Sequence, residues 1–389
     1  MAEYLSPGVY VEEFDSGIKA MEGVGTSTAG FVGMAQKGPV KGLPVLITSM
    51  ADYQRRFGGY LSERKYGKKR FLPYAVEQFF NNGGSACYVM RVCERDDQGK
   101  YKAKEACCSI SQTEGKSFCN LTAADPGQWG NNVNAKFTLM TKNRTLVTGR
   151  TEISGQEKKN TMIYELSDTS AIQEDDIVCL QQSEKKSPFF FGLVEAIDGT
   201  KVTIGRLTEE AEKLQFPGGG SGEPGGGSGE SGGGSGESGG GSSEPVKEEE
   251  TPNVFLYLAE WVLTIQDDTA SEQYEGVSFN PGRSNCADNL LEKSQMIKVK
   301  TDKDNLTPGM IEKLLGKNEE LSFTVSLKGG SDGTISPDID ASMYEGDGST
   351  PDTRTGLTAF KTLSDVSIMA IPGIVDKTVQ SALVSHCEN

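Results

Sequence analysis

Residues 329–333 read Gly-Gly-Ser-Asp-Gly, which is the spacing of a nucleophile elbow, where a serine attacks a substrate carbonyl. Such an elbow joins a strand to a helix, and a histidine must accept the proton of the serine hydroxyl. Residues 334–337 do not begin like a helix, and the single histidine of the chain is His386. The pattern therefore indicates a tight polar turn, with a hydrolase that uses Ser331 as a less favoured alternative.

Two other short motifs resemble the end of a phosphate-binding loop, Gly115-Lys116-Ser117 and Gly316-Lys317. The full motif needs a glycine five residues before its last glycine, because only then can backbone N–H groups surround a phosphate. Ile110 and Ile311 occupy these two positions. We therefore expect no nucleotide cofactor.

A third motif has the alternate spacing of a calcium loop, with Asp338, Asp340 and Ser342 at every second position. Met343 stands where the sharp turn of such a loop needs glycine, so a solvated acidic loop is the better interpretation. A single histidine also excludes a site built from several histidines. We expect no metal, no cofactor and no catalytic set, which favours a structural protein over an enzyme.

Composition limits the partners and the location. The 389 residues are enough for two or three domains, and the net charge of −16 argues against a nucleic-acid binder. No run of 18 apolar residues is present, and the first residues lack the pattern of a signal peptide, so we expect a cytoplasmic product without membrane insertion. The eight cysteines form no C-x-x-C pair and are expected to be reduced and in several cases buried on strands.

The first hundred residues predict an α/β layer. Strands are expected at residues 28–34, 44–48 and 86–92, with helices at 49–57 and 73–80 between them. Ser49 is placed to cap the first of these helices. Further strands are expected at 117–122, 133–141, 255–265, 296–300, 321–327 and, as a buried strand, 366–371; further helices are expected at 308–315, 355–363 and 376–386.

From Thr145 onward the pattern changes to short strands at close spacing, at 145–147, 162–166, 176–180, 189–197 and 201–204. Asp198-Gly199 is a strong hairpin signal. We predict a small all-β, barrel-like domain at 143–216, followed by a flexible Gly/Ser/Glu-rich linker at 217–250. The predicted fold class is thus an α/β (α+β) core domain, discontinuous over 21–142 and 252–389, with this β domain inserted.

An isolated strand is expected in the N-terminal arm, residues 1–20. Turn-forming residues flank it, and no hairpin brings back a partner strand. Its partner could be an edge of its own domain or another copy of the chain. The residues of this strand are Val9, Tyr10, Val11, Glu12, Glu13 and Phe14.

In their order and spacing, several stretches resemble the sheath protein of contractile phage tails and related contractile injection systems. Each stretch is short, but together they cover almost the whole chain apart from the inserted segment. They are residues 5–13, 28–33 with 37–39, 53–59, 75–84 leading to 88–92, 129–131, 274–281, 327–333 and 369–373.

The resemblance implies a structural subunit that stacks as hexameric rings around an inner tube and contracts to drive the tube through a target envelope. It implies as partners other copies of the chain, the inner tube protein, the baseplate and the tail terminator. Because family members donate terminal strands to neighbouring subunits, it also implies that residues 9–14 form an intersubunit strand by addition to another copy. Assembly would take place in the cytoplasm of the producing bacterial cell, within a phage tail or phage-tail-like particle.

Two expectations qualify this resemblance. Family members continue beyond the stretch 371–373 and the following helix into a C-terminal assembly domain that carries the acceptor sheet and the tube contact. We therefore expect this chain to be a fragment or to have that domain on a separate chain. The alternative function is a secreted or surface-displayed binding module, with the inserted β domain as its ligand-binding head.

Overall fold

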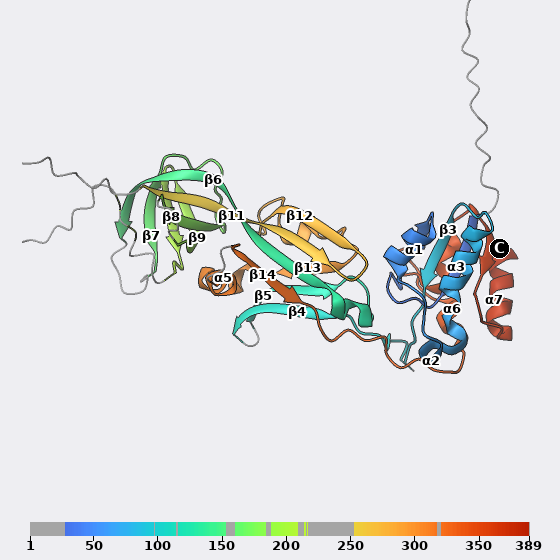
Figure 1. Ribbon diagram of the computed structural model, residues 1–389. Coiled ribbons are helices and arrows are strands. Elements are labelled where there is room, and N and C mark those ends of the chain that lie inside the picture. Colours follow the sequence, from blue (N-terminus) through green and yellow to red (C-terminus); the bar gives the residue numbers. More distant parts are fainter. Residues whose placement is uncertain are drawn as a thin grey trace, which may run out of the picture. The chain divides into compact units, whose positions relative to one another are not determined.

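The structure is a computed structural model that describes residues 28–96, 98–113, 116–152, 160–183, 188–208, 214, 216, 253–316 and 320–388. These residues form two compact units. Unit 1 contains described residues of 28–35, 39–93 and 335–388, and so combines the blue and red parts of the chain in Figure 1. Unit 2 contains those of 36–38 and 94–334. The predicted intersubunit strand, residues 9–14, and the linker, 217–250, lie outside the described residues.

Unit 1 is built on a four-stranded sheet with the order β15-β1-β3-β2. β1 (Thr28–Gly33) lies parallel to β3 (Cys87–Arg91) and to β15 (Val366–Ala370), and β2 (Val45–Ile47) pairs antiparallel with β3. The helix α3 (Leu72–Asn81) precedes β3 and packs on β1. The mixed α/β arrangement predicted for residues 28–92 is confirmed.

The first helix of unit 1, α1 (Met50–Phe57), forms for the predicted reason. Ser49 Oγ accepts a hydrogen bond from the backbone N–H of Asp52 at 3.1 Å, and Gly58 ends the helix with a φ of 85°. The remaining helical segments of unit 1 are α2 (Glu63–Tyr66), α6 (Ala341–Glu345), α7 (Lys377–Glu388) and the 3₁₀ turns η1 (Gly67–Arg70) and η6 (Gly356–Thr362). The helix predicted at 355–363 is therefore a 3₁₀ helix.

β15 differs from its prediction as a buried strand. It lies at the edge of the sheet, and Ile368 is 49% exposed. Its strand neighbour in this sheet, β1, has Gly30 opposite Met369, and a Cβ on that glycine would overlap the methionine sulfur. The apolar sequence of the strand could not reveal this, because burial depends on what the sheet order places beside it.

Unit 2 consists mainly of strands. An eight-stranded sheet has the order β12-β11-β8-β9-β10-β7-β6-β14, with an additional pairing of β11 with β6, and a second sheet has the order β13-β5-β4. The bounds are β4 (Cys107–Thr113), β5 (Lys116–Ala123), β6 (Asn134–Glu152), β7 (Met162–Leu166), β8 (Ile177–Gln182), β9 (Phe190–Asp198), β10 (Lys201–Gly205), β11 (Val254–Gln266), β12 (Ser271–Val277), β13 (Ile297–Thr301) and β14 (Ser322–Ser326). The helical segments are α4 (Ala287–Leu290), α5 (Pro308–Leu315), η2 (Gln128–Asn132) and η5 (Lys303–Asn305).

The long strand β6 corrects the prediction of two separate strands at 133–141 and 145–147. Asn143 has a φ of 53°, and it lies where the register of β6 against β11 shifts. Such a bulge keeps the strand continuous although its polar residues have the composition of a turn. Residues 94–142 and 253–334 consequently belong to the same unit as 143–208, so the unit boundaries differ from the predicted domain boundaries.

The core of unit 2 is aromatic around Trp261 of β11, which is fully buried. Its ring lies 6.4 Å from that of Phe137, 5.8 Å from that of Phe279 and 5.7 Å from that of Phe323, measured between centroids. These residues come from β6, the segment after β12, and β14. Offset and edge-to-face contacts of this kind stabilise beyond the area they bury.

The prediction of several buried thiols on strands is confirmed. Cys87, Cys119 and Cys179 lie on β3, β5 and β8, and all three are free and buried. Burial raises the pKa of the Cys87 thiol to about 12, which keeps it protonated and unreactive at neutral pH.

Candidate functional site

Four loops of unit 2 that are distant in the sequence come together, and we call them the loop cluster. They are residues 36–38, 127–132, 267–270 and 328–333, and side chains of Lys37, Asn131 and Asn132 join them. Three of the four contain stretches that carry the sheath resemblance: Lys37, the run from Trp129 to Asn131, and residues 328–333. We therefore treat the loop cluster as the candidate functional site.

Lys37 is the central cation of the loop cluster. Its Nζ donates hydrogen bonds to Asp267 Oδ2 at 2.7 Å and Thr269 Oγ1 at 2.8 Å, and it lies 5.6 Å from the centroid of the Trp129 ring. The side chains of Lys37 and Asp267 are only 9% and 7% exposed. Burial by itself would raise the pKa of Asp267, but the hydrogen bonds from Lys37 and Thr269 outweigh it and lower that pKa. The Asp267 side chain thus remains a carboxylate at neutral pH.

Asn131 and Gly330 join two of the loops reciprocally. Asn131 Nδ2 donates to the Gly330 carbonyl oxygen, and the Gly330 N–H donates to Asn131 Oδ1, both at 2.8 Å. An amide side chain that satisfies both backbone groups of one residue acts like a short strand pairing. A Cβ on Gly330 would overlap the carbonyl oxygen of Gly127, so the close approach requires glycine here.

Asp332 holds the start of η2 in the same cluster. Its Oδ1 accepts a hydrogen bond from the backbone N–H of Gln128 at 2.8 Å. Beside it, Gly127 has a φ of 146°, and an added Cβ would lie 2.7 Å from the Trp129 ring. Polar groups of the loop cluster therefore pair largely with one another, which suits a rigid support more than a site that must bind and release a substrate.

Ser331 does not form a nucleophile elbow. Its backbone N–H donates to the Lys104 carbonyl oxygen at 3.0 Å and its own carbonyl oxygen accepts from the Lys104 N–H at 2.7 Å, so it lies in an isolated β-bridge. It lacks the positive φ of a strained turn, and the next helix along the described chain begins only at Ala341. His386 lies on α7 of unit 1, where burial first and Lys361 second lower its pKa. The tight turn predicted here is not formed, because residues 328 and 331 pair in isolated β-bridges with Cys107 and Lys104.

The two phosphate-loop motifs also lack the required geometry. Lys116 and Ser117 begin β5 next to its antiparallel partner β4, and Gly115 lies outside the described residues. Gly316 ends α5 with a φ of 59°, and Lys317 is outside the described residues. Neither motif leads from a strand into a helix, which is the arrangement a phosphate-binding loop needs.

The acidic motif of unit 1 is used locally. Asp340 Oδ1 caps α6 by accepting hydrogen bonds from Ser342 N at 3.0 Å and Ser342 Oγ at 2.7 Å, and Asp338 is exposed. Within the described residues no group of three or more His, Cys, Asp or Glu side chains could hold a metal ion. In the same part of the chain, no helix is both long and apolar enough to cross a membrane.

One buried polar network had no sequence signal. The Asp176 side chain is fully buried, and Arg283 donates to it from Nε at 2.6 Å and from Nη2 at 2.5 Å. Asn280 Nδ2 donates to the same carboxylate at 2.7 Å. The partners are more than a hundred residues apart in sequence, so only the folded chain reveals that the network joins the segment before β8 to that after β12.

Comparisons with known proteins give the following. No protein-family model matches the chain, and no curated protein matches it. Among solved structures it is similar to the crystal structure of a sheath tail protein from Desulfitobacterium hafniense, with 11% identity and a TM-score of 0.33 over 97% of this chain and 48% of that one. It is also similar to that of a sheath tail protein from Listeria innocua, with 14% identity and a TM-score of 0.20 over 46% and 30%. The chain thus spans about half the length of the first of these proteins.

Proposed function

We propose that this chain is a structural subunit of a contractile tail sheath, which polymerises around an inner tube and contracts to drive it through a target envelope. One observation carries the proposal: the stretches around Lys37, Asn131 and Gly330, which each resemble the sheath family, contact one another in the loop cluster. Similar short stretches that arose by chance would have no reason to meet after folding.

The chemistry of these contacts supports a structural role. Lys37 forms an ion pair with Asp267. Asn131 donates a hydrogen bond to Gly330, and Asp332 accepts one from Gln128. Each residue type is therefore explained by packing and hydrogen bonding between loops. A hydrolase would instead need a base beside Ser331, which lies in a β-bridge.

The partners follow from the same proposal. Other copies of the chain would form hexameric rings, with residues 9–14 added as a strand to a neighbour. The inner tube protein, the baseplate and the tail terminator complete the set, with no nucleic acid and no membrane insertion. The particle would assemble in the cytoplasm of the producing bacterial cell as part of a phage tail or a phage-tail-like particle.

We also propose that the β-rich segment 143–216 belongs to a closed barrel that includes β11 from outside it and β6, which begins before it. β11 pairs with both β8 and β6, and the neighbours β8-β9-β10-β7-β6 connect these two. This pairing order supports a ring of six strands in which no edge remains free.

Electron microscopy of the full-length gene product, purified from its producing cells with its partners, tests the proposed function. We expect hollow tubes with six-fold symmetry in cross-section and a second, shorter and wider form. Discrete particles that bind a ligand through the β-rich unit would instead select the binding module, and the tail-sheath function would then be rejected.

A further inference from the structure

A strongly basic segment stands out in this acidic chain. Residues 64–70 read Arg-Lys-Tyr-Gly-Lys-Lys-Arg, so five of seven residues are cationic in a chain of net charge −16. They span the end of α2 and the 3₁₀ turn η1. Gly67 joins the two with a φ of 51°, which turns the chain sharply and brings the cations to one region of unit 1.

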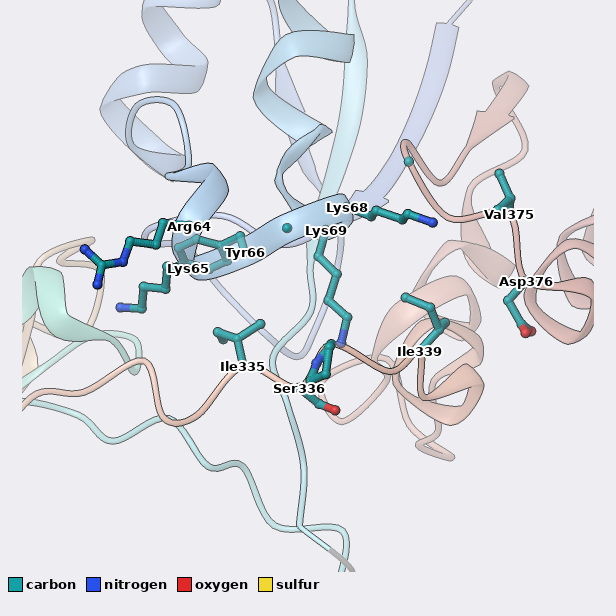
Figure 2. A pocket seen from close by; sticks show the side chains of 13 residues that line it. Arg64, Lys65, Tyr66, Lys68, Lys69, Ile335, Ser336, Ile339, Val375 and Asp376 are labelled. Carbon is teal, nitrogen blue, oxygen red and sulfur yellow. The ribbon is translucent and has the colours of Figure 1, made fainter.

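Two of these cations serve the fold. Lys69 is buried, and its Nζ donates to the Asp338 carbonyl oxygen at 2.8 Å. Arg70 pairs with Glu63 Oε1 at 3.3 Å, and its guanidinium carbon lies 4.3 Å from the centroid of the Phe71 ring. In Figure 2, Lys69 points toward the segment that carries Ser336.

The other three cations, Arg64, Lys65 and Lys68, are exposed. Lys65 Nζ lies 5.5 Å from the centroid of the Tyr66 ring. Among the described residues, neither Arg64 nor Lys68 forms an ion pair with a carboxylate. The charges of Arg64 and Lys68 are therefore available to a partner.

These cations border a cavity of about 590 Å³ in unit 1, shown in Figure 2. Its apolar lining includes Ile335, Ile339 and Val375, and Val375 is 80% exposed. The one carboxylate of the lining, Asp376, is engaged: its Oδ1 accepts hydrogen bonds from the N–H groups of Thr378 at 2.9 Å and Val379 at 3.2 Å. The cavity thus combines the charges of Arg64 and Lys68 with an apolar lining in which Val375 is exposed.

We infer that this cavity and the basic segment 64–70 form a docking surface for an acidic segment of a second copy of the chain. The charge balance supports this occupant, because each copy carries an excess of 16 negative charges and repels other copies unless a positive region offsets it. A second copy can supply both acidic side chains for the cations and apolar side chains to cover Val375, which the phosphate backbone of a nucleic acid cannot. The inference rests on the proposed function in that it names one contact by which copies associate.

The test uses the full 389-residue chain, prepared in ¹⁴N and ¹⁵N forms and mixed. At about 20 mM salt a carbodiimide should join Lys65 or Lys68 of one isotopic form to a carboxylate of the other, and at about 300 mM salt these crosslinks should be lost. Mass spectrometry identifies the acidic segment. If these lysines crosslink only within a single copy, the inference is wrong.

A charge-reversal variant with a matched control gives a second readout. Arg64→Glu/Lys65→Glu/Lys68→Glu and the control Lys41→Glu/Lys293→Glu/Lys313→Glu change the net charge equally, and all six side chains are exposed. The first should weaken self-association in sedimentation equilibrium at low salt about tenfold more than the control. If the first variant fails to fold, Arg64→Gln/Lys65→Gln/Lys68→Gln replaces it. Equal effects of the variant and its control would overturn the inference.

Two further results separate the possibilities. Binding of phosphatidylserine vesicles or duplex DNA through residues 64–70, without crosslinks between copies, would assign the surface to another partner and overturn the inference. If the full-length product forms no tubes but the crosslinks between copies are found, the proposed function fails and the docking surface stands. If tubes form equally well with the triple variant and no such crosslinks are found, only the docking surface fails.

Discussion

Lys37 and Asp267, which are 230 residues apart in sequence, form an ion pair of 2.7 Å that is almost completely removed from solvent. The pair joins a three-residue segment, Gln36–Gly38, to the turn between β11 and β12 within unit 2. Because neither charge is well hydrated, removing one leaves the other buried without its ion-pair partner, although Asp267 keeps hydrogen bonds from Thr269 and Ala270.

Lys37→Met should therefore lower the free energy of unfolding of unit 2 by about 3 kcal/mol. Both tryptophans of the chain, Trp129 and Trp261, lie in unit 2, so tryptophan fluorescence during urea unfolding reports on this unit alone. Lys136→Met is the control, since its ion pair with Glu320 is exposed, and it should change the stability by less than about 1 kcal/mol. Equal changes in the two variants would contradict the structural role of Lys37.

The same pair predicts the acid sensitivity of unit 2. The pKa of Asp267 is held below its usual value of 3.8, because hydrogen bonds from Lys37 and Thr269 outweigh the effect of burial. Its contribution to stability is therefore complete above the usual pKa and is lost as the pH falls through the lowered folded-state pKa. The difference in urea midpoint between wild type and Asp267→Asn should be constant near neutral pH and shrink below about pH 4. Glu320→Gln, which removes a carboxylate from an exposed ion pair of the same unit, is measured alongside as the control.

Two glycines of unit 2 should respond to alanine in opposite directions. Gly330→Ala places a Cβ against the Gly127 carbonyl oxygen and should lower the free energy of unfolding by about 2 kcal/mol. Gly309 lies in α5, and a Cβ added to it would meet open space, so Gly309→Ala should raise the stability by about 0.5 kcal/mol. Urea unfolding followed by tryptophan fluorescence measures both changes. Equal destabilisation by the two variants would show that Gly330 is not more closely packed than Gly309.

The predicted intersubunit strand can be tested by deletion in the full-length protein. Removing residues 1–17 should abolish tube formation in electron micrographs and shift the melting temperature of the subunit by less than about 2 °C, because the strand contributes only between copies. Val9→Pro/Val11→Pro should act like the deletion, since proline removes the N–H groups that strand addition needs. Glu12→Gln/Glu13→Gln, which keeps those groups, should still form tubes. Normal tubes from the deletion variant would rule out this role.

Much of the local structure was predictable from short-range signals. The cap at Ser49, the helix α5 and the strand β7 were found at or close to their predicted positions, because capping, turn residues and apolar periodicity act within a few residues. The tight turn predicted at Ser331 was wrong, because the backbone of this residue pairs with Lys104, which is distant in the sequence. The role of residues 9–14 remains a prediction.

Long-range pairing decided the rest. The polar residues around Asn143 have the composition of a turn, but pairing with β11 on both sides of Asn143 keeps them in one continuous strand of unit 2. β15 is apolar throughout most of its length, yet its place at the sheet edge leaves Ile368 exposed. The partners of Lys37 and Asp176 lie 230 and 107 residues away. Contacts over such separations leave no periodic trace in the chain, because they arise only when the folded backbone brings distant segments together, and that arrangement is a property of the whole fold.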